Sequence, residues 1–364
     1  MKIAIIAPLV IAIREPQRGG SQSFVADLAV GLQTRGHEVN IYAATGSEIP
    51  GVTVIDTGID PATLSDFLYR AASPARVDGR AAEEAFSTVY AAVREVSYDV
   101  VHNHAFDAPA IRLAAALEVP VVHTLHLPPD PSVVAALEEV RLFDRRPVVA
   151  AVSASQANAW RALTHVEVVL PNGVPTARMS WTERRGLGVV FAGRLSPEKG
   201  AAEAIDIAKA AGTHIDLYGD PYDLEYAEKY IYPKRGELGV RVHSGVERTV
   251  LWEIMSRASV VLCPAKWDEP FGMVAAEAQA GGTPVVAFRR GGLQEVVRDG
   301  VTGFLVAPSD IRAAAEAVEK AANSISRYAC RHHAETCLDL ESSLDAHEEL
   351  YSRVTRPLKA RSGA

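Results

Sequence analysis

The sequence predicts an α/β protein made of two doubly wound parallel-sheet domains that face each other across a cleft. The chain has 364 residues, more than a single hydrophobic core usually serves. Short runs rich in valine and isoleucine alternate with helical patterns through both halves, which is typical of parallel sheets covered by helices on both faces. A turn-forming sequence at 171–175, Pro-Asn-Gly-Val-Pro, separates the two series and marks the expected junction between the domains.

The first series is expected to build an N-terminal domain from residues 1–178. Its β-branched runs predict strands at 2–10, 38–43, 53–57, 99–104, 120–126, 148–153 and 166–170. The apolar periodicity between these runs predicts helices at 22–35, 81–96, 108–117, 131–143 and 155–163.

The second series is expected to build a C-terminal domain from residues 186–338. Its strands are predicted at 187–192, 214–218, 240–243, 259–263, 284–288 and 303–306. Residues 339–364 are expected to form a terminal helix and a short, solvated basic tail. The helix is predicted from one apolar stripe, formed by Leu340, Leu344, His347, Tyr351 and Val354.

Composition and charge argue against several functional classes. The net charge of −8 disfavours general nucleic-acid binding, which needs a basic face, although local cations and helix ends can still hold an anionic small ligand. No apolar run reaches about 18 residues, so no membrane span is expected, and the first residues show no cleavage signal. Three cysteines without zinc spacing suit a reduced, cytoplasmic protein.

Two glutamates eight positions apart, Glu269 and Glu277, mark the most informative segment of the chain. A strand precedes Glu269, a Pro-Phe-Gly turn follows it, and a helical pattern continues through Gly281. Glu269 is therefore expected at the carboxyl end of a strand, and Glu277 about two turns into the next helix. The amide groups of residues 271–274 would lack partners at the start of this helix, where a phosphate or a cluster of sugar hydroxyls binds well.

A second strand-end motif, Gly-Arg-Leu-Ser-Pro-Glu-Lys-Gly, occupies residues 193–200. Ser196 as a cap and Pro197 as the first helical residue predict that a helix starts here. Arg194 and Lys199 flank this start, and two cations beside a helix N-terminus predict a diphosphate clamp. Solvated surface cations are the alternative, which the neighbouring glutamate segment disfavours.

Two predicted strands of the first domain end in histidines: His102, His104, His123 and His126. A His-x-His pair can chelate a metal, but Asp107 is the one carboxylate near this spacing, so no metal site is expected. His126 is expected to point into the mouth of the cleft, where it can hydrogen-bond a sugar hydroxyl and orient the reacting ring. The other three histidines are expected to be hydrogen-bonded wall residues.

Glycine-containing turns mark three further strand ends. The pair at 19–20 lets the backbone approach a ligand before a helix start that favours an anion, although a plain turn is equally consistent; its spacing is not the G-x-G-x-x-G fingerprint. The Asn-Gly pair at 172–173 is expected to be a hinge turn. The pair at 291–292 leads to Glu295, whose carboxylate suits the beginning of a helix.

Together these segments resemble the retaining glycosyltransferases of family 4, which have the two-domain GT-B fold. The resemblance covers nearly the whole chain in order, and the combination of Gly-Arg-x4-Lys-Gly with Glu-x7-Glu makes it specific. It implies a soluble, metal-independent enzyme of the hexosyltransferase type. The reaction implied is retaining transfer of a sugar from a nucleotide-diphosphate sugar, preferably a UDP- or GDP-sugar, to an acceptor hydroxyl.

The resemblance also implies the two residues nearest the reaction. His126 would contact the sugar close to its anomeric carbon. Glu269 would hold the sugar, together with the amides of Phe271 and Gly272. The acceptor would bind against the first domain.

The remaining roles concern the donor. By resemblance, Arg194 and Lys199 would bind the diphosphate, and Gly20 would approach it from the other domain. Glu277 would bind the ribose hydroxyls, and Val246 would lie near the base. The expected donor-binding set is Gly20, Arg194, Lys199, Val246, Phe271, Gly272, Met273, Val274 and Glu277.

The family's retention is usually assigned to front-face attack, in which a donor phosphate oxygen takes the acceptor proton. A double displacement would need two carboxylates about 5 Å apart on opposite sides of the bond, which Glu269 and Glu277, along one segment, do not fit. The protein would then act by orientation and electrostatic stabilisation, with no cofactor beyond the nucleotide-sugar co-substrate.

Two departures and two alternatives accompany this interpretation. Tyr-Gly-Asp-Pro at 218–221 replaces a frequent Gly-x-Gly turn on the base side, and Leu-Gln-Glu at 293–295 replaces a common Pro-Glu. Residues 130–143 carry too few cations to predict strong membrane binding. A nucleotide-sugar epimerase or a sugar phosphorylase shares the fold, and a two-lobed solute-binding protein would need an export signal. The acceptor, the sugar and the oligomeric state stay open.

Overall fold

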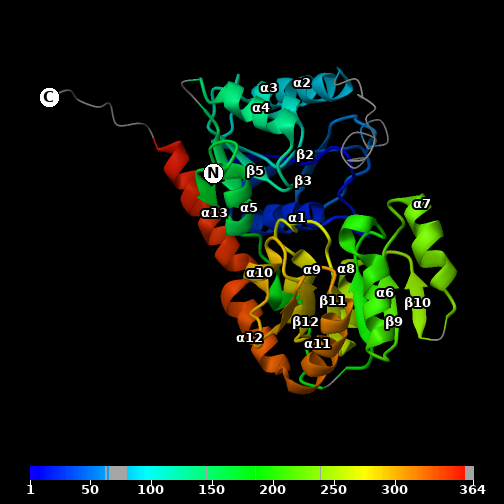
Figure 1. The fold of residues 1–364 in the computed structure, drawn as a ribbon. Coiled ribbons are helices and arrows are strands. Elements are labelled where there is room, and N and C mark those ends of the chain that lie inside the picture. Colours follow the sequence, from blue (N-terminus) through cyan, green and yellow to red (C-terminus); the bar gives the residue numbers. More distant parts are fainter. Residues whose placement is uncertain (62–63, 65–79, 144–145, 185, 238, 357–364) are drawn as a thin grey trace.

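Two parallel sheets form two lobes, one above the other in Figure 1, which confirms the expected two-domain α/β architecture. The computed structural model describes residues 1–61, 64, 80–143, 146–184, 186–237 and 239–356. Helices lie on both faces of each sheet, so the strands are buried as their apolar sequences require.

The first lobe holds, within the described residues, a seven-stranded sheet in the order β3-β2-β1-β4-β5-β6-β7, with every pairing parallel. Its strands are β1 (Lys2–Ile6), β2 (Glu38–Ala43), β3 (Thr53–Asp56), β4 (Val100–Asn103), β5 (Val121–Leu125), β6 (Val148–Ala151) and β7 (Val168–Val169). Its helices are α1 (Gly20–Thr34), α2 (Arg80–Arg94), α3 (Ala108–Ala114), α4 (Pro131–Val140) and α5 (Ala154–Arg161).

The second lobe holds a six-stranded sheet in the order β10-β9-β8-β11-β12-β13, again parallel throughout the part described. Its strands are β8 (Val189–Ala192), β9 (Ile215–Tyr218), β10 (Val240–His243), β11 (Val260–Cys263), β12 (Val285–Phe288) and β13 (Gly303–Val306). The helices of this half are α6 (Ala201–Ala210), α7 (Leu224–Tyr226), α8 (Arg248–Arg257), α9 (Met273–Ala280), α10 (Leu293–Val296), α11 (Ile311–Ser324), α12 (Arg327–Cys337) and α13 (Leu340–Thr355).

The strand order reverses once in each sheet, between β1 and β4 in the first lobe and between β8 and β11 in the second. Open parallel sheets bind ligands outside the carboxyl ends of their strands at such a reversal. The glycine pair at 19–20 follows β1, Arg194 follows β8 and Glu269 follows β11. The topology therefore directs the main sequence motifs to the positions where a ligand is expected.

Several strands and helices are shorter in the structure than the sequence predicts. The first strand stops at Ile6 instead of residue 10, yet Leu9 and Val10 are only 0% and 2% exposed. Apolar residues continue to be buried beneath the loops after a strand has left its hydrogen-bonded ladder, so hydrophobicity alone overestimates strand length. The strands predicted at 99–104, 120–126, 148–153 and 166–170 and the helices predicted at 108–117 and 131–143 are shortened in the same way.

The helix predicted to start at Ser196-Pro197 begins instead at Ala201. Residues Pro197–Lys199 form a separate 3₁₀ turn, and Gly200 follows in the left-handed conformation with φ 74°. A Cβ on Gly200 would lie 2.0 Å from the carbonyl oxygen of Pro264, so only glycine fits, and its conformation interrupts the helix. The Ser196 hydroxyl donates to Glu198 Oε1 (2.6 Å) and makes no side-chain cap.

The predicted depth of Glu277 in its helix is also wrong. Helix α9 begins at Met273, so Glu277 lies little more than one turn from its start rather than two. Gly272 precedes the helix with φ 108°, a conformation that glycine adopts readily. The positive φ of Gly272 thus places the first residue of α9 at Met273.

The last helix returns from the second lobe to the first. In Figure 1, α13 continues from α12 of the lower lobe and runs up beside the upper one, where it packs on α1 and β4. The predicted apolar stripe is confirmed, because Leu344, His347 and Tyr351 are each 0% exposed. Arg35 of α1 completes the contact by binding the carboxylates of Glu341, Asp345 and Glu348 at 2.6–2.7 Å.

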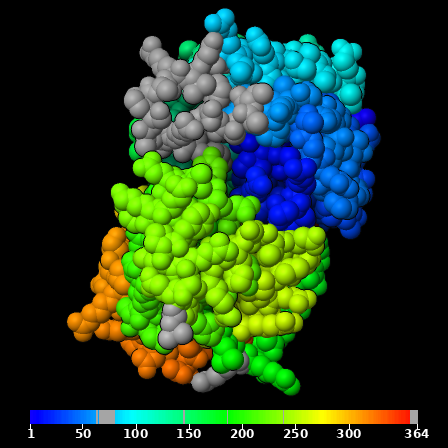
Figure 2. Space-filling view, turned by 90° about the vertical axis from the view of Figure 1, so that its right-hand side faces the viewer, coloured from blue at the N-terminus to red at the C-terminus, as the bar shows by residue number. Residues whose placement is uncertain are grey.

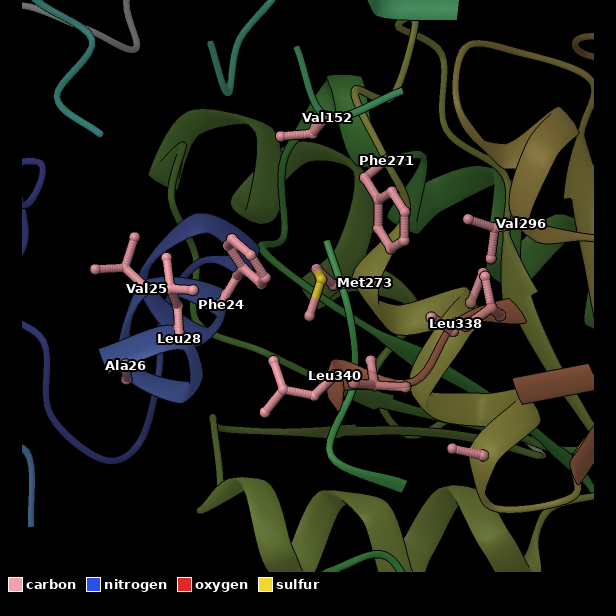
Figure 3. Packing of buried hydrophobic residues seen from close by; sticks show 14 of the residues in the cluster. Phe24, Val25, Ala26, Leu28, Val152, Phe271, Met273, Val296, Leu338 and Leu340 are labelled. Carbon is pink, nitrogen blue, oxygen red and sulfur yellow. The ribbon is translucent and has the colours of Figure 1, made fainter. Parts of the chain in front are cut away.

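Hydrophobic packing crosses the boundary between the lobes. Phe24 and Leu28 of α1 belong to the same buried cluster as Phe271 and Met273 of the second lobe, and Figure 3 shows these side chains together. In Figure 2 the first residues of the chain, in dark blue, lie directly against the second lobe. Among the helices of the described chain, none is both long and apolar enough to cross a membrane.

Candidate active site in the cleft

Two adjoining cavities form a cleft between the lobes. The smaller has a volume of about 150 Å³, and the larger about 810 Å³. Gly20 of the first lobe and Arg194 and Met273 of the second line both. The cavities are therefore two parts of one cleft.

All eleven residues that the sequence assigned to the site line this cleft. The smaller cavity is lined by Gly20, His126, Arg194, Lys199, Glu269, Phe271, Gly272, Met273 and Val274. The larger cavity adds Val246 and Glu277. The structure therefore places these residues in the cleft, and the role of each one stays a prediction.

Lys199, Trp267 and Glu269 form a compact group, here called the Lys–Trp–Glu group. Lys199 Nζ donates to Glu269 Oε1 at 2.8 Å and to Oε2 at 2.7 Å, and Trp267 Nε1 donates to Oε2 at 2.6 Å. The ammonium also lies 4.8 Å from the centre of the Trp267 ring, within the range of a cation–π contact. Burial by itself would raise the pKa of the Glu269 carboxyl, but the lysine and the indole outweigh it and the net pKa is lowered.

Arg194 also has a partner on its own lobe. Its Nη2 donates to Glu198 Oε1 at 3.2 Å, and its guanidinium lies 5.1 Å from the centre of the Tyr222 ring. Arg194 and Lys199 thus sit at the two ends of the 196–199 turn, rather than beside a longer helix as the sequence predicted. Both cations still line the smaller cavity, together with Glu269.

The start of α9 supplies backbone donors to the same cavity. The first hydrogen bond of this helix runs from the amide of Ala276 to the carbonyl of Gly272 (3.1 Å), so the amides of residues 273–275 precede it. Phe271, Gly272, Met273 and Val274 all line the cavity. An oxygen-rich or anionic group is favoured at such a helix start.

Glu277 takes part in a buried ion network that joins the lobes. Arg248 Nη2 lies 3.1 Å from Glu277 Oε1 and 2.8 Å from Oδ2 of Asp27 on α1. Burial raises the pKa of the Glu277 carboxyl, and Arg248 partly opposes that rise. The Trp252 side chain also lowers the pKa of this carboxyl, and Glu277 lines the larger cavity.

The first lobe contributes a wall of buried histidines. His126 Nε2 lies 2.8 Å from His104 Nδ1, so Nδ1 is the His126 nitrogen left for the cleft. Burial lowers the pKa of His126 to about 3, and burial with the neighbouring histidines puts that of His104 well below its ordinary value. Both rings are therefore neutral at physiological pH and act as hydrogen-bonding groups rather than charges.

The other wall histidines differ in how many of their ring nitrogens are hydrogen-bonded. His102 uses both nitrogens, with Tyr351 Oη at 2.6 Å and Thr124 Oγ1 at 2.7 Å, as expected. His123 Nδ1 lies 2.7 Å from Asn103 Nδ2, but Nε2 of His123 and Nε2 of His104 are buried without a hydrogen-bond partner. Within the part of the chain that the structure describes, no three His, Cys, Asp or Glu side chains form a group able to hold a metal ion.

Asp220 organises the part of the larger cavity near Val246, and it belongs to the 218–221 segment that departs from the family pattern. Its Oδ1 accepts from the amide of Gly245 at 3.1 Å, next to Val246, and its Oδ2 lies 3.8 Å from Arg18 Nε of the first lobe. The aspartate therefore fixes the loop at 245–246 and links it to the glycine loop of the first lobe.

Sequence reasoning missed two residues of the site, Trp267 and Arg248. Trp267 and Arg248 carry the contacts described above; an aromatic residue two positions before Glu269 was the available signal for the first, and Arg248 gave none. Glu295 was expected to complement the start of its own helix. It lies in the first turn of α10, as expected, and its carboxylate also accepts from the amides of Ala154 (2.8 Å) and Ser155 (2.7 Å) at the start of α5 in the other lobe.

Each half of the chain matches a glycosyltransferase family model. The family model described as "Glycosyltransferase Family 4" matches residues 18–178, and the one described as "Glycosyl transferases group 1" matches residues 184–334. A D-inositol 3-phosphate glycosyltransferase from Xylanimonas cellulosilytica is 33% identical over 79% of this chain and 79% of its own. A phosphatidyl-myo-inositol mannosyltransferase from Mycobacterium tuberculosis is 30% identical over 86% of this chain and 85% of its own.

Solved structures share the fold at lower identity. Sucrose-phosphate synthase from Thermosynechococcus elongatus superposes with a TM-score of 0.78 at 19% identity, covering 97% of this chain and 98% of that one. Anabaena HepE, solved in complex with UDP-glucose, gives a TM-score of 0.73 at 20% identity, with 97% and 100% covered. Similarity at this level carries the fold alone.

Proposed function

This chain is a member of glycosyltransferase family 4, and from that premise we propose that it moves a sugar from a nucleotide-diphosphate sugar to an acceptor hydroxyl with retention of the anomeric configuration. Sugar transfer is the activity of the family. The donor class, the stereochemistry and independence from metal are the proposal.

The observation that carries the proposal is the convergence of opposite charges with free backbone donors in the smaller cavity. Lys199 and Arg194 provide two cations there, and the amides at the start of α9 provide further donors. A diphosphate needs such donors, because its charge grows when the sugar bond breaks. Glu269, on the same wall, accepts hydrogen bonds from sugar hydroxyls.

The site then provides orientation and charge stabilisation without a protein nucleophile. His126 presents a neutral Nδ1 to the cleft and would hydrogen-bond the sugar near its anomeric carbon. Glu277 would accept from the ribose, with Val246 beside the base. The leaving diphosphate would be stabilised by Lys199 and Arg194, so we propose that no divalent metal is required.

Three of the similar proteins bear on the substrates. We prefer a UDP- or GDP-sugar as donor; HepE, which shares the fold, is described in complex with UDP-glucose. The two similar enzymes are both named for inositol-containing compounds. Arg14 and Arg18 line the larger cavity from the first lobe. We therefore give first place to inositol-containing acceptors, with and without phosphate, bound on that side. Free thiols at Cys263, Cys330 and Cys337 suit a reducing compartment, and we place the reaction in the cytoplasm.

The test is a transfer assay with UDP-, GDP- and ADP-sugars of α configuration, an acceptor panel, and NMR of the product. An α-linked product that forms equally with and without EDTA supports the proposal. A β-linked product contradicts retention, and loss of product in EDTA contradicts metal independence. An isomerised nucleotide sugar formed without an acceptor would instead indicate an epimerase.

A further inference from the structure

Lys199 and Glu269 are bound to each other in the cleft, although the proposed function assigns them to different parts of one ligand. The ammonium donates to both carboxylate oxygens at 2.7–2.8 Å. A diphosphate that takes Lys199 must therefore compete with Glu269 for the same ammonium. Sugar hydroxyls must compete with Lys199 for the same carboxylate.

We propose that this ion pair is exchanged when the donor binds. The diphosphate takes Lys199, and Glu269, retained by Trp267, becomes available to the sugar hydroxyls. The inference rests on the proposed function and adds to it a coupling between the diphosphate and sugar subsites. It also assigns Trp267 as a positioning residue.

The geometry of the Lys–Trp–Glu group supports the exchange. The indole N–H binds Oε2 at 2.6 Å through a hydrogen bond that does not involve the lysine, so Glu269 keeps this donor after Lys199 turns away. The lysine side chain is 22% exposed and lines the cavity, and its flexible stem lets the ammonium move. Arg194 lines the same cavity and, like Lys199, favours the charged form of Glu269.

Burial makes the two exchanges depend on each other. The Glu269 side chain is 16% exposed, and a buried carboxylate that loses its cation is destabilised unless other donors replace it. A nucleoside diphosphate alone takes Lys199 and leaves Glu269 with Trp267. A nucleotide sugar replaces both partners at once, because its hydroxyls donate to the carboxylate as its phosphates accept from the lysine.

The distinguishing prediction is that loss of the carboxylate strengthens binding of the bare diphosphate. Glu269→Gln keeps the shape but removes the competing charge. We expect it to lower the Kd of a nucleoside diphosphate by about threefold to tenfold, the size of the net contribution of one ordinary hydrogen bond. The matched nucleoside monophosphate, which lacks the second phosphate, should change by less than about twofold.

The experiment is isothermal titration calorimetry with UDP, GDP and ADP, continued with the tightest ligand of wild type and its monophosphate. Lys199→Met provides the second background: there, Glu269→Gln should no longer tighten the diphosphate, because no lysine is left to compete for. If Glu269→Gln does not fold, Glu269→Asp, whose shorter side chain withdraws the carboxylate from Lys199, replaces it. An unchanged or weaker diphosphate affinity in the folded variant overturns the exchange.

Trp267→Phe tests the positioning role. The ring is kept and the N–H donor is lost, so diphosphate affinity should stay within about twofold while kcat/KM for sugar transfer falls by about tenfold. Equal weakening of diphosphate binding and transfer would show a merely structural role. If wild type binds none of the three diphosphates, the proposed function fails, an outcome separate from failure of the exchange.

Discussion

The two walls of the cleft differ in charge and in how the chain builds them. The second-lobe wall is ionic: Lys199, Arg194 and Glu269 come from loops after β8 and β11 of one sheet. The first-lobe wall presents His126, which rests on His104 and is neutral because burial lowers its pKa to about 3. A charged wall can grip a charged donor, whereas a neutral wall can orient the reacting groups without competing for that charge.

The walls also differ in their dependence on distant sequence. The ionic wall is complete within the second lobe. The histidine wall depends on α13, because His102 hydrogen-bonds Tyr351, 249 residues away, and its ring lies 5.5 Å from that of His347. Substitutions in the ionic wall should therefore change donor binding. Substitutions in the histidine wall should change the stability of the protein as well as the orientation of the bound sugar.

The largest effect is expected from Lys199→Ala in the ionic wall. Loss of charge-assisted bonds worth about 1.5–3 kcal/mol should lower kcat/KM by about 10–150-fold, measured by steady-state transfer. Lys266→Ala is the matched control, since Lys266 is half-exposed on the loop that carries Glu269 and pairs with Glu203 outside the cleft. Equal losses in both variants would show that general positive charge, rather than Lys199, matters.

Acidification should weaken the histidine wall. The pKa values of His123 and His126 are lowered to about 3 and that of His347 to about 4, so the unfolded chain binds more protons below about pH 6.5. Stability should be complete above about pH 7 and fall with pH, by about 1.4 kcal/mol for each such histidine between pH 7.5 and 5.5. Asp107, whose pKa burial raises to about 6, opposes this fall over the same interval.

Urea unfolding at the two pH values measures that effect. His347→Leu removes a buried ring whose Nε2 has no partner and should make the loss smaller by about one histidine's share. Replacement of the exposed His332 by leucine is the control. Equal pH dependence in wild type and His347→Leu would mean that His347 is protonated in the folded state.

Glu277→Gln separates ligand binding from the link between the lobes. Loss of one charge-assisted acceptor should raise the Kd of the nucleotide by about tenfold in calorimetry. Asp27→Asn removes the other carboxylate that Arg248 binds without touching the proposed ribose contact. It should lower the unfolding temperature and leave nucleotide affinity nearly unchanged; the opposite pattern would transfer the ribose role away from Glu277.

The smallest effect is expected at a contact between the two lobes outside the cleft. Glu295→Gln keeps the hydrogen-bonding shape but removes the charge that faces the start of α5. A charge at a helix N-terminus is worth about 0.3–1 kcal/mol, so kcat/KM should fall by about twofold to fivefold. A larger loss would show that this contact holds the cleft in its working geometry.

The sequence was sufficient for the fold and for most of the ionic wall, for a physical reason. Strands and helix starts are encoded by neighbouring residues, and parallel topology brings the carboxyl ends of the strands to one edge, so motifs at 193–200 and 269–277 could be assigned to one cleft. Contacts between distant segments could not be read in this way. Glu269 meets Lys199 across 70 residues, and Glu295 meets Ala154 across 141.

The same difference between contacts within a segment and contacts between distant segments explains the wrong predictions. The interruption at Gly200 results from the close approach of the Pro264 carbonyl, a neighbour that no local pattern reveals. The partners of His102 and His104 likewise come from other strands and from α13. Domain limits at 178, 186 and 338 stay predictions, and the tail after 356 lies outside the described residues.

The most direct measurement is a crystal structure of the protein with its best-binding nucleotide sugar. We predict phosphate oxygens within hydrogen-bond distance of Lys199 and Arg194, the sugar hydroxyls on a Glu269 carboxylate still held by Trp267, and His126 Nδ1 facing the anomeric carbon. A ligand bound elsewhere, with Lys199 and Glu269 still paired in the cleft, would contradict the proposed donor site.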